Sequence, residues 1–234
     1  MGAEVAGGAL AAAREALVAA ARRLEDSGLN HNSSGNLGVR VGDGVLVTPT
    51  GIPARALTPA DGVLLDPDGR PVDGHRLPTS EWQLHVEVLR RRPDVGAIVH
   101  THSPEATAAA VLRRAVPPVH YVVARFATVN SDTPAGLPCA PYATYGTAEL
   151  ATGVADTLGP HGLACLMANH GAVVLADDLV TGVALALDLE WLCGVHRRAL
   201  QQGDPVALED AEVARVAGRF ASYGQVGGAP PTQI

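Results

Sequence analysis

The chain has 234 residues, of which 47% are hydrophobic and 18% charged, which is enough material for one domain with a sizeable core. Its formal net charge of −7 argues against broad binding to nucleic acid or to a membrane surface. All 17 of its Lys+Arg residues are arginine, which excludes a Schiff-base lysine, a lysine-bound pyridoxal cofactor and a Walker-type lysine.

Cysteine usage and hydropathy indicate a cytoplasmic protein. Cys139, Cys165 and Cys193 are unevenly spaced and form no C-x-x-C pair, so neither a disulfide framework nor a thiolate zinc site is expected. The N-terminus lacks a basic region followed by an apolar core, and no apolar run reaches the roughly 18 residues of a membrane span. We therefore expect no secretory signal and no membrane partner.

The first third of the chain predicts one helix followed by hairpins. Apolar residues recur at helical spacing before Gly28, and glycine-containing turns separate short alternating runs. The expected elements are a helix over 9–26, a polar loop over 28–36, strands over 37–41 and 45–48, a turn over 48–51, and a strand pair over 63–66 and 71–72.

From residue 79 onward, helical patterns alternate with single strands. The expected elements are a helix over 81–91, a strand ending at 102, a helix over 106–113, a strand-like run over 119–123, an irregular segment over 125–140, a helix over 147–158, strands over 163–167 and 172–175, and helices over 179–201 and 208–223. This order predicts an α/β/α sandwich with a largely antiparallel central sheet in a single domain over residues 1–226, with a flexible tail over 227–234. A Rossmann fingerprint is absent.

Two histidines stand at the end of the most apolar strand. His100 and His102 are two residues apart, so in a strand both imidazoles point to the same side. Imidazole is the commonest protein ligand for zinc and similar ions. Two polar residues at a strand end are the alternative interpretation.

Two further residues are candidates for the same centre. His170 lies in a tight turn between two apolar strands, and three histidines with an open fourth position are typical of a catalytic zinc site. Glu81 begins a helix, where a carboxylate usually serves only the helix dipole. Beside a metal, it can act as a ligand or as a general base.

Turns of small polar residues offer an anion site without lysine. The stretches 32–36 and 48–51 combine backbone N–H groups with Ser, Thr and Asn side chains, and Thr79 and Ser80 add hydroxyls just before Glu81. For each stretch taken alone, an ordinary turn is the favoured interpretation.

Taken together, seven motifs resemble the class II aldolase/adducin family, and within it the fuculose-phosphate aldolase branch. The resemblance covers about residues 10–223. Its motifs are Gly28-Leu29-Asn30 through Ser34-Gly35-Asn36, Leu46 through Pro53, Leu77 through Trp82, His100-Thr101-His102, Pro118 through Tyr121, Pro138 through Gly146, and Asn169-His170-Gly171.

The resemblance assigns roles to individual residues. It implies Zn²⁺, or another divalent metal such as Mn²⁺ or Co²⁺, on His100, His102 and His170, with Glu81 as a further ligand and acid/base. It implies a homotetramer with sites at subunit interfaces, in which Tyr121 comes from a neighbour and Tyr223 assists from the C-terminal end. The residues implied for the substrate phosphate are Ser33, Asn36, Thr50, Gly51, Thr79 and Ser80.

The implied reaction splits a ketose 1-phosphate, such as L-fuculose 1-phosphate, into dihydroxyacetone phosphate and an aldehyde such as L-lactaldehyde, through a metal-stabilised enediolate. A lysine-free chain cannot form an iminium, so a Lewis-acid cation is the natural substitute. A pentulose-phosphate 4-epimerase, a sugar-phosphate dehydratase or decarboxylase, and an adducin-like interaction module stay open. The epimerases carry an aspartate where this chain has His120-Tyr121-Val122-Val123. The segment 125–138 follows Tyr121, the residue implied to lie near the aldehyde, so the identity of the aldehyde stays open.

Overall fold

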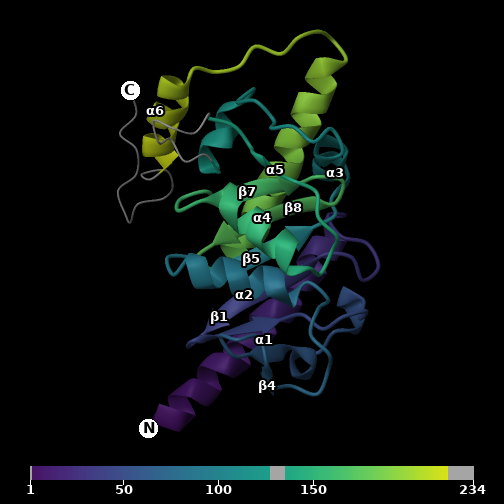
Figure 1. The fold of residues 1–234 in the computed structure, drawn as a ribbon, viewed down its shortest axis with the longest axis vertical. Coiled ribbons are helices and arrows are strands. Elements are labelled where there is room, and N and C mark those ends of the chain that lie inside the picture. The colour runs from purple at the N-terminus through teal and green to yellow at the C-terminus, as the bar shows by residue number, and fades with distance from the viewer. Residues whose placement is uncertain (1, 127–134, 221–234) are drawn as a thin grey trace, which may run out of the picture.

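The computed structural model describes residues 2–126 and 135–220, and its centre is one eight-stranded sheet (Figure 1). The strand order is β4-β3-β2-β1-β5-β8-β7-β6, and every neighbouring pair is antiparallel except the parallel pair β6–β7. The strands are β1 (Asn36–Val41), β2 (Gly44–Val47), β3 (Val63–Leu65), β4 (Pro71–Asp73), β5 (Ala97–Thr101), β6 (Cys139–Ala140), β7 (Ala164–Met167) and β8 (Gly171–Ala176).

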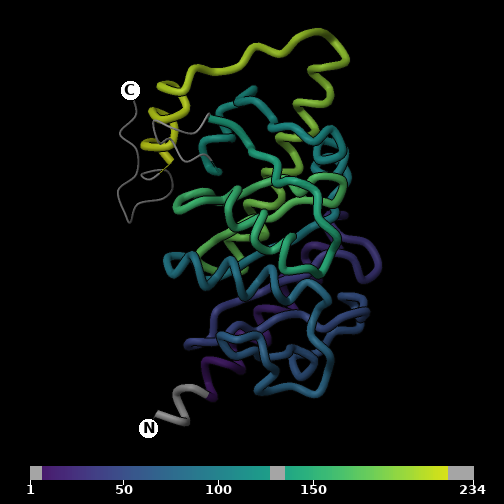
Figure 2. The backbone as a smooth tube through the Cα atoms, in the orientation of Figure 1, coloured from purple at the N-terminus to yellow at the C-terminus, as the bar shows by residue number. Residues whose placement is uncertain are grey.

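Helices cover both faces of this sheet, as the α/β/α expectation requires. The helices are α1 (Gly2–Asp26), α2 (Trp82–Arg91), α3 (Pro104–Ala110), α4 (Ala148–Leu158), α5 (Leu179–Leu200) and α6 (Asp210–Phe220). Helices α2 and α4 pack together on one face, while α1, α3 and α5 pack on the other. Figure 2 shows the long connection from α5 to α6. Helix α6 packs beside the short helix η3 (Tyr121–Arg125).

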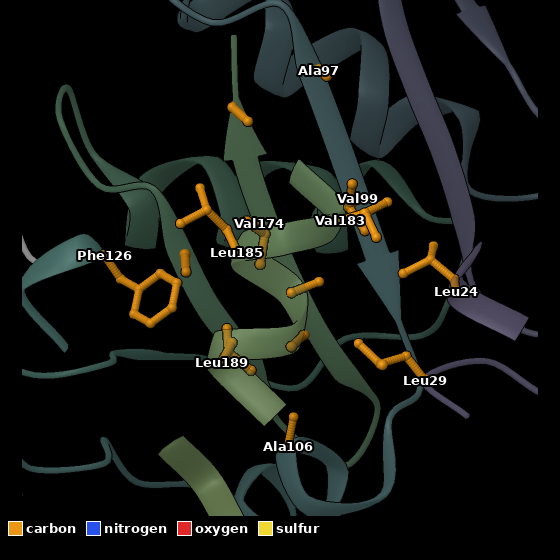
Figure 3. Close-up of a cluster of buried hydrophobic side chains, with 14 of the residues drawn as sticks. Leu24, Leu29, Ala97, Val99, Ala106, Phe126, Val174, Val183, Leu185 and Leu189 are labelled. Atoms are coloured by element: carbon orange, nitrogen blue, oxygen red, sulfur yellow. The ribbon is translucent and has the colours of Figure 1, made fainter. Parts of the chain in front are cut away.

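The central strands are buried on both faces, and their side chains alternate between two hydrophobic clusters. In β5, Ala97 and Val99 point into the cluster beneath α1 and α5, which Figure 3 shows, while Ile98 points into the cluster beneath α2 and α4. Because His100 follows Ile98 by two residues, the strand period places its imidazole on the α2 side. This alternation decides which helix the metal-binding candidates meet.

Helix α5 is long and apolar enough to cross a membrane by length and composition alone, contrary to the expectation that no segment of the chain is. Helices in the core of water-soluble proteins can have the same length and apolar composition. Here Leu185 and Leu189 of α5 are buried against the sheet in the cluster of Figure 3.

The expectation of a strand over 119–123 was wrong. Residues Tyr121–Arg125 form η3, and the His120 side chain caps it by accepting a hydrogen bond from the backbone N–H of Val122. The run of β-branched residues therefore packs beside α5 and α6 without joining the sheet. Within the segment expected to be irregular, Cys139–Ala140 forms the edge strand β6. The tail over 227–234 lies outside the described residues.

Candidate metal centre

Strand β5 holds the first candidate ligand in a fixed orientation. The His100 side chain is fully buried, and its Nδ1 lies 3.0 Å from the backbone oxygen of Ala172 on the neighbouring strand β8. Since a carbonyl only accepts, Nδ1 donates its proton to Ala172, and Nε2 is the atom that faces the other candidate ligands. His102 lies just beyond the strand end, where its backbone N–H donates to Oδ1 of Asn30 at 3.2 Å.

The other two candidates come from different elements. His170 lies in the turn between β7 and β8, where Asn169 adopts a φ of +53° and the His170 N–H donates to the oxygen of Met167. Glu81 precedes α2, and its backbone N–H donates to the hydroxyl of Thr79. A turn and a helix start thus bring both side chains to the end of β5.

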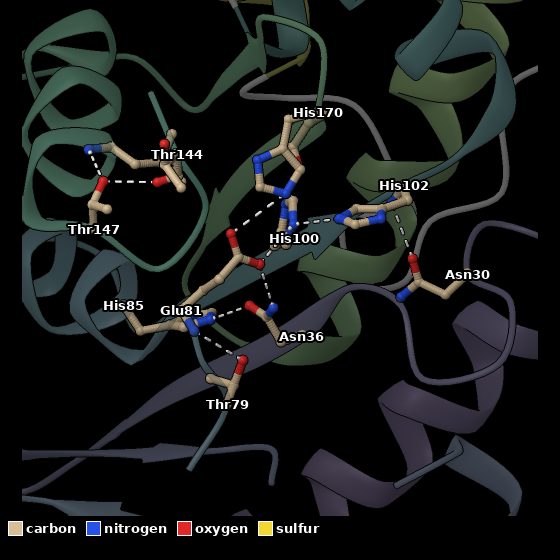
Figure 4. A network of polar contacts seen from close by, with 12 residues as sticks. Asn30, Asn36, Thr79, Glu81, His85, His100, His102, Thr144, Thr147 and His170 are labelled. Atoms are coloured by element: carbon tan, nitrogen blue, oxygen red, sulfur yellow. Dashed lines mark hydrogen bonds and ion pairs between the residues drawn. The ribbon is translucent and has the colours of Figure 1, made fainter. Parts of the chain in front are cut away.

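The four side chains converge on one centre. One ligand atom from each of Glu81, His100, His102 and His170 lies within 4.8 Å of the others (Figure 4). Nε2 of His100 lies 3.0 Å from Nε2 of His102 and 3.2 Å from Oε2 of Glu81, and Nε2 of His170 lies 3.4 Å from Oε1 of Glu81. Oε1 of Glu81 is buried without a hydrogen-bond partner among the described residues. A buried carboxylate oxygen of this kind, facing imidazole nitrogens, fits a divalent cation.

Without an ion, the electrostatics keep three of the four candidate ligands in the state that binds a cation. Burial lowers the pKa of His100, but the carboxylate of Glu81 and the carbonyl of Ala172 raise it by more, so an ion on Nε2 would have to replace a proton. Burial, together with the charge of His100, lowers the pKa of His102 and of His170 to about 4. Burial works against ionisation of Glu81, but His100, His170 and the amide of Asn36 together hold the pKa of its carboxyl below the ordinary value. The site therefore offers two neutral imidazoles and an ionised carboxylate.

An open cavity of about 490 Å³ adjoins the centre. Its lining includes Glu81, His102 and His170, and also the six residues that the family resemblance assigns to the substrate phosphate: Ser33, Asn36, Thr50, Gly51, Thr79 and Ser80. The Asn36 side chain was expected to bind the phosphate, but its polar atoms contact other protein side chains. Nδ2 of Asn36 donates to Glu81 at 2.8 Å, and Oδ1 of Asn36 lies 2.5 Å from Nε2 of His85, so both polar atoms already have protein partners.

Other residues were missed or lie elsewhere. Tyr142, Tyr145 and Asn169 line the cavity but received no role from the sequence, although all three stand within motifs that carry the resemblance. Tyr121 is half exposed on η3 and is not among the lining residues of this cavity in the described part of its own chain. Tyr223 lies outside the described residues.

Three histidines and a glutamate beside an open polar cavity form a group that could hold a metal ion, and an arrangement that side chains do not enclose is typical of catalytic rather than structural metal sites. Comparison with known proteins identifies the class. Residues 15–196 match the model of the Class II Aldolase and Adducin N-terminal domain.

Named relatives support the same class. The 5-methylthioribulose-1-phosphate/5-deoxyribulose-1-phosphate aldolase of Rhodospirillum rubrum is 41% identical over 217 residues, covering 93% of this chain and 95% of that protein. The L-fuculose phosphate aldolase of Escherichia coli K12 is 41% identical over 198 residues, covering 84% of this chain and 88% of that protein. A solved structure of L-fuculose 1-phosphate aldolase superposes with a TM-score of 0.84 at 33% identity, covering 89% of this chain and 96% of that one.

The chain belongs to the class II aldolase/adducin family, and it is an enzyme of the aldolase type, a carbon–carbon lyase. The predicted fold class is confirmed as well. A non-enzymatic, adducin-like module is thereby set aside.

Proposed function

We propose that this protein is a zinc-dependent aldolase that cleaves a ketose 1-phosphate to dihydroxyacetone phosphate and an aldehyde. The observation that carries the proposal is the convergence of three imidazoles and a carboxylate beside a cavity lined with hydroxyl and amide groups. His100, His102, His170 and Glu81 would hold the ion. When bound, it supplies a Lewis acid for the negative charge that develops on the oxygens of the substrate.

In the reverse aldol reaction, the proton of the C4 hydroxyl is removed and the C3–C4 bond breaks, with its electron pair passing into an enediolate. A proton then returns to C3. Glu81 is the group we assign to proton transfer at C3, because its ionised carboxylate faces the cavity from beside the imidazoles. The resemblance favours Tyr121 of a neighbouring subunit and Tyr223 as donors near the aldehyde oxygen, in a homotetramer.

The substrate phosphate is proposed to bind away from the imidazoles, against small residues and backbone. Gly51 has a φ of +69° and lines the cavity beside Thr50, and Ser80 is an exposed residue that lines the same cavity. Such a site neutralises phosphate with hydrogen bonds and so needs no lysine. Ser33 and Thr79 complete it in this proposal, whereas Asn36 lines the same cavity with both polar side-chain atoms engaged by Glu81 and His85.

The substrate is proposed from the chemistry that the relatives' names share. L-Fuculose 1-phosphate, 5-deoxyribulose 1-phosphate and 5-methylthioribulose 1-phosphate all carry a phosphate on C1 beside the keto group, and all release dihydroxyacetone phosphate on cleavage. They differ only in the aldehyde. We therefore propose a deoxyketose 1-phosphate of this kind as the substrate, handled in the cytoplasm.

The experiment is a panel of these three ketose phosphates, followed by release of dihydroxyacetone phosphate. L-Ribulose 5-phosphate, with detection of D-xylulose 5-phosphate, tests the epimerase alternative on the same preparation. Cleavage of at least one ketose 1-phosphate supports the proposal. Epimerisation, dehydration or decarboxylation without any release of dihydroxyacetone phosphate would reject it.

A further inference from the structure

A fourth histidine, fully buried, stands behind the three of the candidate metal centre without contacting them directly. His85 lies on α2, one helical turn after Glu81, and its side chain has no exposed surface. Its Nε2 lies 2.5 Å from Oδ1 of Asn36, whose Nδ2 donates to Oε2 of Glu81 at 2.8 Å (Figure 4). The three side chains form one line of contacts that ends at the carboxylate.

The direction of these hydrogen bonds follows from the last acceptor. An ionised carboxylate only accepts, so Asn36 must present its NH₂ group to Glu81 and its oxygen to His85. His85 must then carry its proton on Nε2. Burial and the charge of His100 lower the pKa of His85 to about 3, so the ring is neutral and has a single N–H to donate.

The rest of the ring has no polar role. Nδ1 of His85 is buried without a hydrogen-bond partner in the described part of the chain. A Cβ at Gly38 would lie 2.5 Å from that nitrogen, so the absence of a side chain at this strand position makes room for the ring. A buried polar atom without a partner destabilises the folded state. An apolar side chain would avoid that cost, so packing alone does not account for a histidine here.

We propose that His85 is a positioning residue for Glu81, acting through the amide of Asn36. Its Nε2–H fixes which end of the amide faces the carboxylate. In the opposite orientation, Oδ1 of Asn36 would face Oε2 of Glu81, and two acceptors would repel each other. With the amide held, Oε2 of Glu81 is anchored and Oε1 stays available for the ion and for proton transfer. This inference rests on the proposed aldolase function.

The matched variants are His85→Gln and His85→Met. The amide nitrogen of glutamine falls near the position of Nε2 and can donate to Asn36, whereas methionine has a similar length and no donor. His196 on α5 is a second buried histidine outside the candidate centre, so His196→Met is the control for replacing a buried imidazole.

The measurements are kcat and KM for the best ketose 1-phosphate, and the visible absorption spectrum of the Co²⁺-loaded protein. We expect His85→Met to lower kcat by about 10–100-fold with little change in KM, and to shift the Co²⁺ bands. His85→Gln should restore both, and His196→Met should alter neither. If His85→Met and His85→Gln behave alike, or if His85→Met matches the wild type, the positioning role is overturned.

A measurement on the wild-type protein decides the matter even where the methionine variant fails to fold. Two-bond ¹H–¹⁵N correlations in histidine-labelled protein report which nitrogen of His85 carries the proton. The proposal requires the Nε2–H form, and an Nδ1–H form would contradict it. Both this readout and the Co²⁺ spectrum stand without substrate. A wild-type protein that cleaves no ketose phosphate therefore rejects the proposed function separately from the role of His85.

Discussion

Asn36 and His100 lie directly opposite each other in the antiparallel pair β1–β5, and both contact the same oxygen of Glu81. Nδ2 of Asn36 lies 2.8 Å and Nε2 of His100 lies 3.2 Å from Oε2 of Glu81. The register of the two strands thus sets the distance between His100, a candidate metal ligand, and the amide of Asn36, which holds Glu81. Since a slip of one residue turns every side chain to the other face, the hydrophobic pattern of β1 and β5 also fixes the geometry of the centre.

Removing the charge of Glu81 should abolish most of the activity while keeping the fold. Glu81→Gln retains the shape of the side chain but has no ionisable carboxylate for ion binding or proton transfer. We expect release of dihydroxyacetone phosphate to fall by about 10²–10⁴-fold in a coupled assay. Glu87→Gln is the control, because Glu87 lies on α2, the helix that Glu81 precedes, and forms ion pairs with Arg90 and Arg91 at the surface. Equal activity of the two variants would contradict the assigned role.

The hydroxyl of Ser80 should matter for binding the phosphate. Ser80→Ala removes a donor, and a hydrogen bond to a charged group contributes about 1.5–3 kcal/mol, so KM should rise about tenfold or more. Ser80→Asp should raise KM further by charge repulsion, while Ser80→Thr keeps the hydroxyl and should stay near the wild type. Steady-state kinetics with a ketose 1-phosphate checks this order. An unchanged KM in Ser80→Asp would remove Ser80 from the phosphate site.

Asp61 should make stability depend on pH in the acid range. The hydroxyl of Thr58 and the guanidinium of Arg76 donate to this buried carboxylate and lower its pKa to about 2, from 3.8. Because the folded pKa lies below the unfolded one, the stabilisation is fully present above about pH 4 and is lost as the pH falls toward 2. It amounts to about 2 kcal/mol at neutral pH.

Asp61→Asn removes this contribution. In denaturant unfolding of the metal-stripped protein, the wild type should exceed the variant by about 2 kcal/mol at pH 7, and the gap should narrow below pH 4. A gap that is constant with pH would show that the carboxylate of Asp61 does not titrate in this way.

The core should respond to truncation according to burial. Leu166 on β7 has no exposed surface and packs in the cluster beneath α5, so Leu166→Ala should cost about 2–5 kcal/mol of unfolding free energy. Leu77 is 75% exposed, and Leu77→Ala should change stability by no more than about 0.5 kcal/mol. Urea unfolding measures both. A small cost at Leu166 would mean that the sheet is not packed as described.

The parts of the molecule that follow periodic patterns could be predicted from the sequence. Strand alternation put His100 and His102 on one side, and the β7–β8 turn provided His170, so the histidine group follows from local rules. The strand predicted over 119–123 was wrong because that prediction also rested on a local pattern alone. Its β-branched residues suit a strand, but tertiary packing beside α5 and the cap by His120 make it a 3₁₀ helix.

The second layer of contacts could not be predicted in this way. Nothing local in the sequence shows that the amide of Asn36 is held between Glu81 and His85, because that arrangement needs the register of β1 against β5 and the start of α2 together. The resemblance alone assigned Asn36 to the phosphate. Tyr142 and Tyr145 line the cavity together with residues far from them in the sequence, so local patterns do not predict this position either.

Metal dependence of cleavage tests the central claim most directly. Release of dihydroxyacetone phosphate should be measured on wild-type protein before chelation, after chelation and after Zn²⁺ is restored, with metal content determined by elemental analysis at each stage. His102→Ala, which removes one of the three imidazoles, is the matched variant. We predict that activity is lost with the metal and returns with it. His102→Ala should show neither bound metal nor activity. Full activity in the metal-stripped protein, or in His102→Ala, would contradict the account.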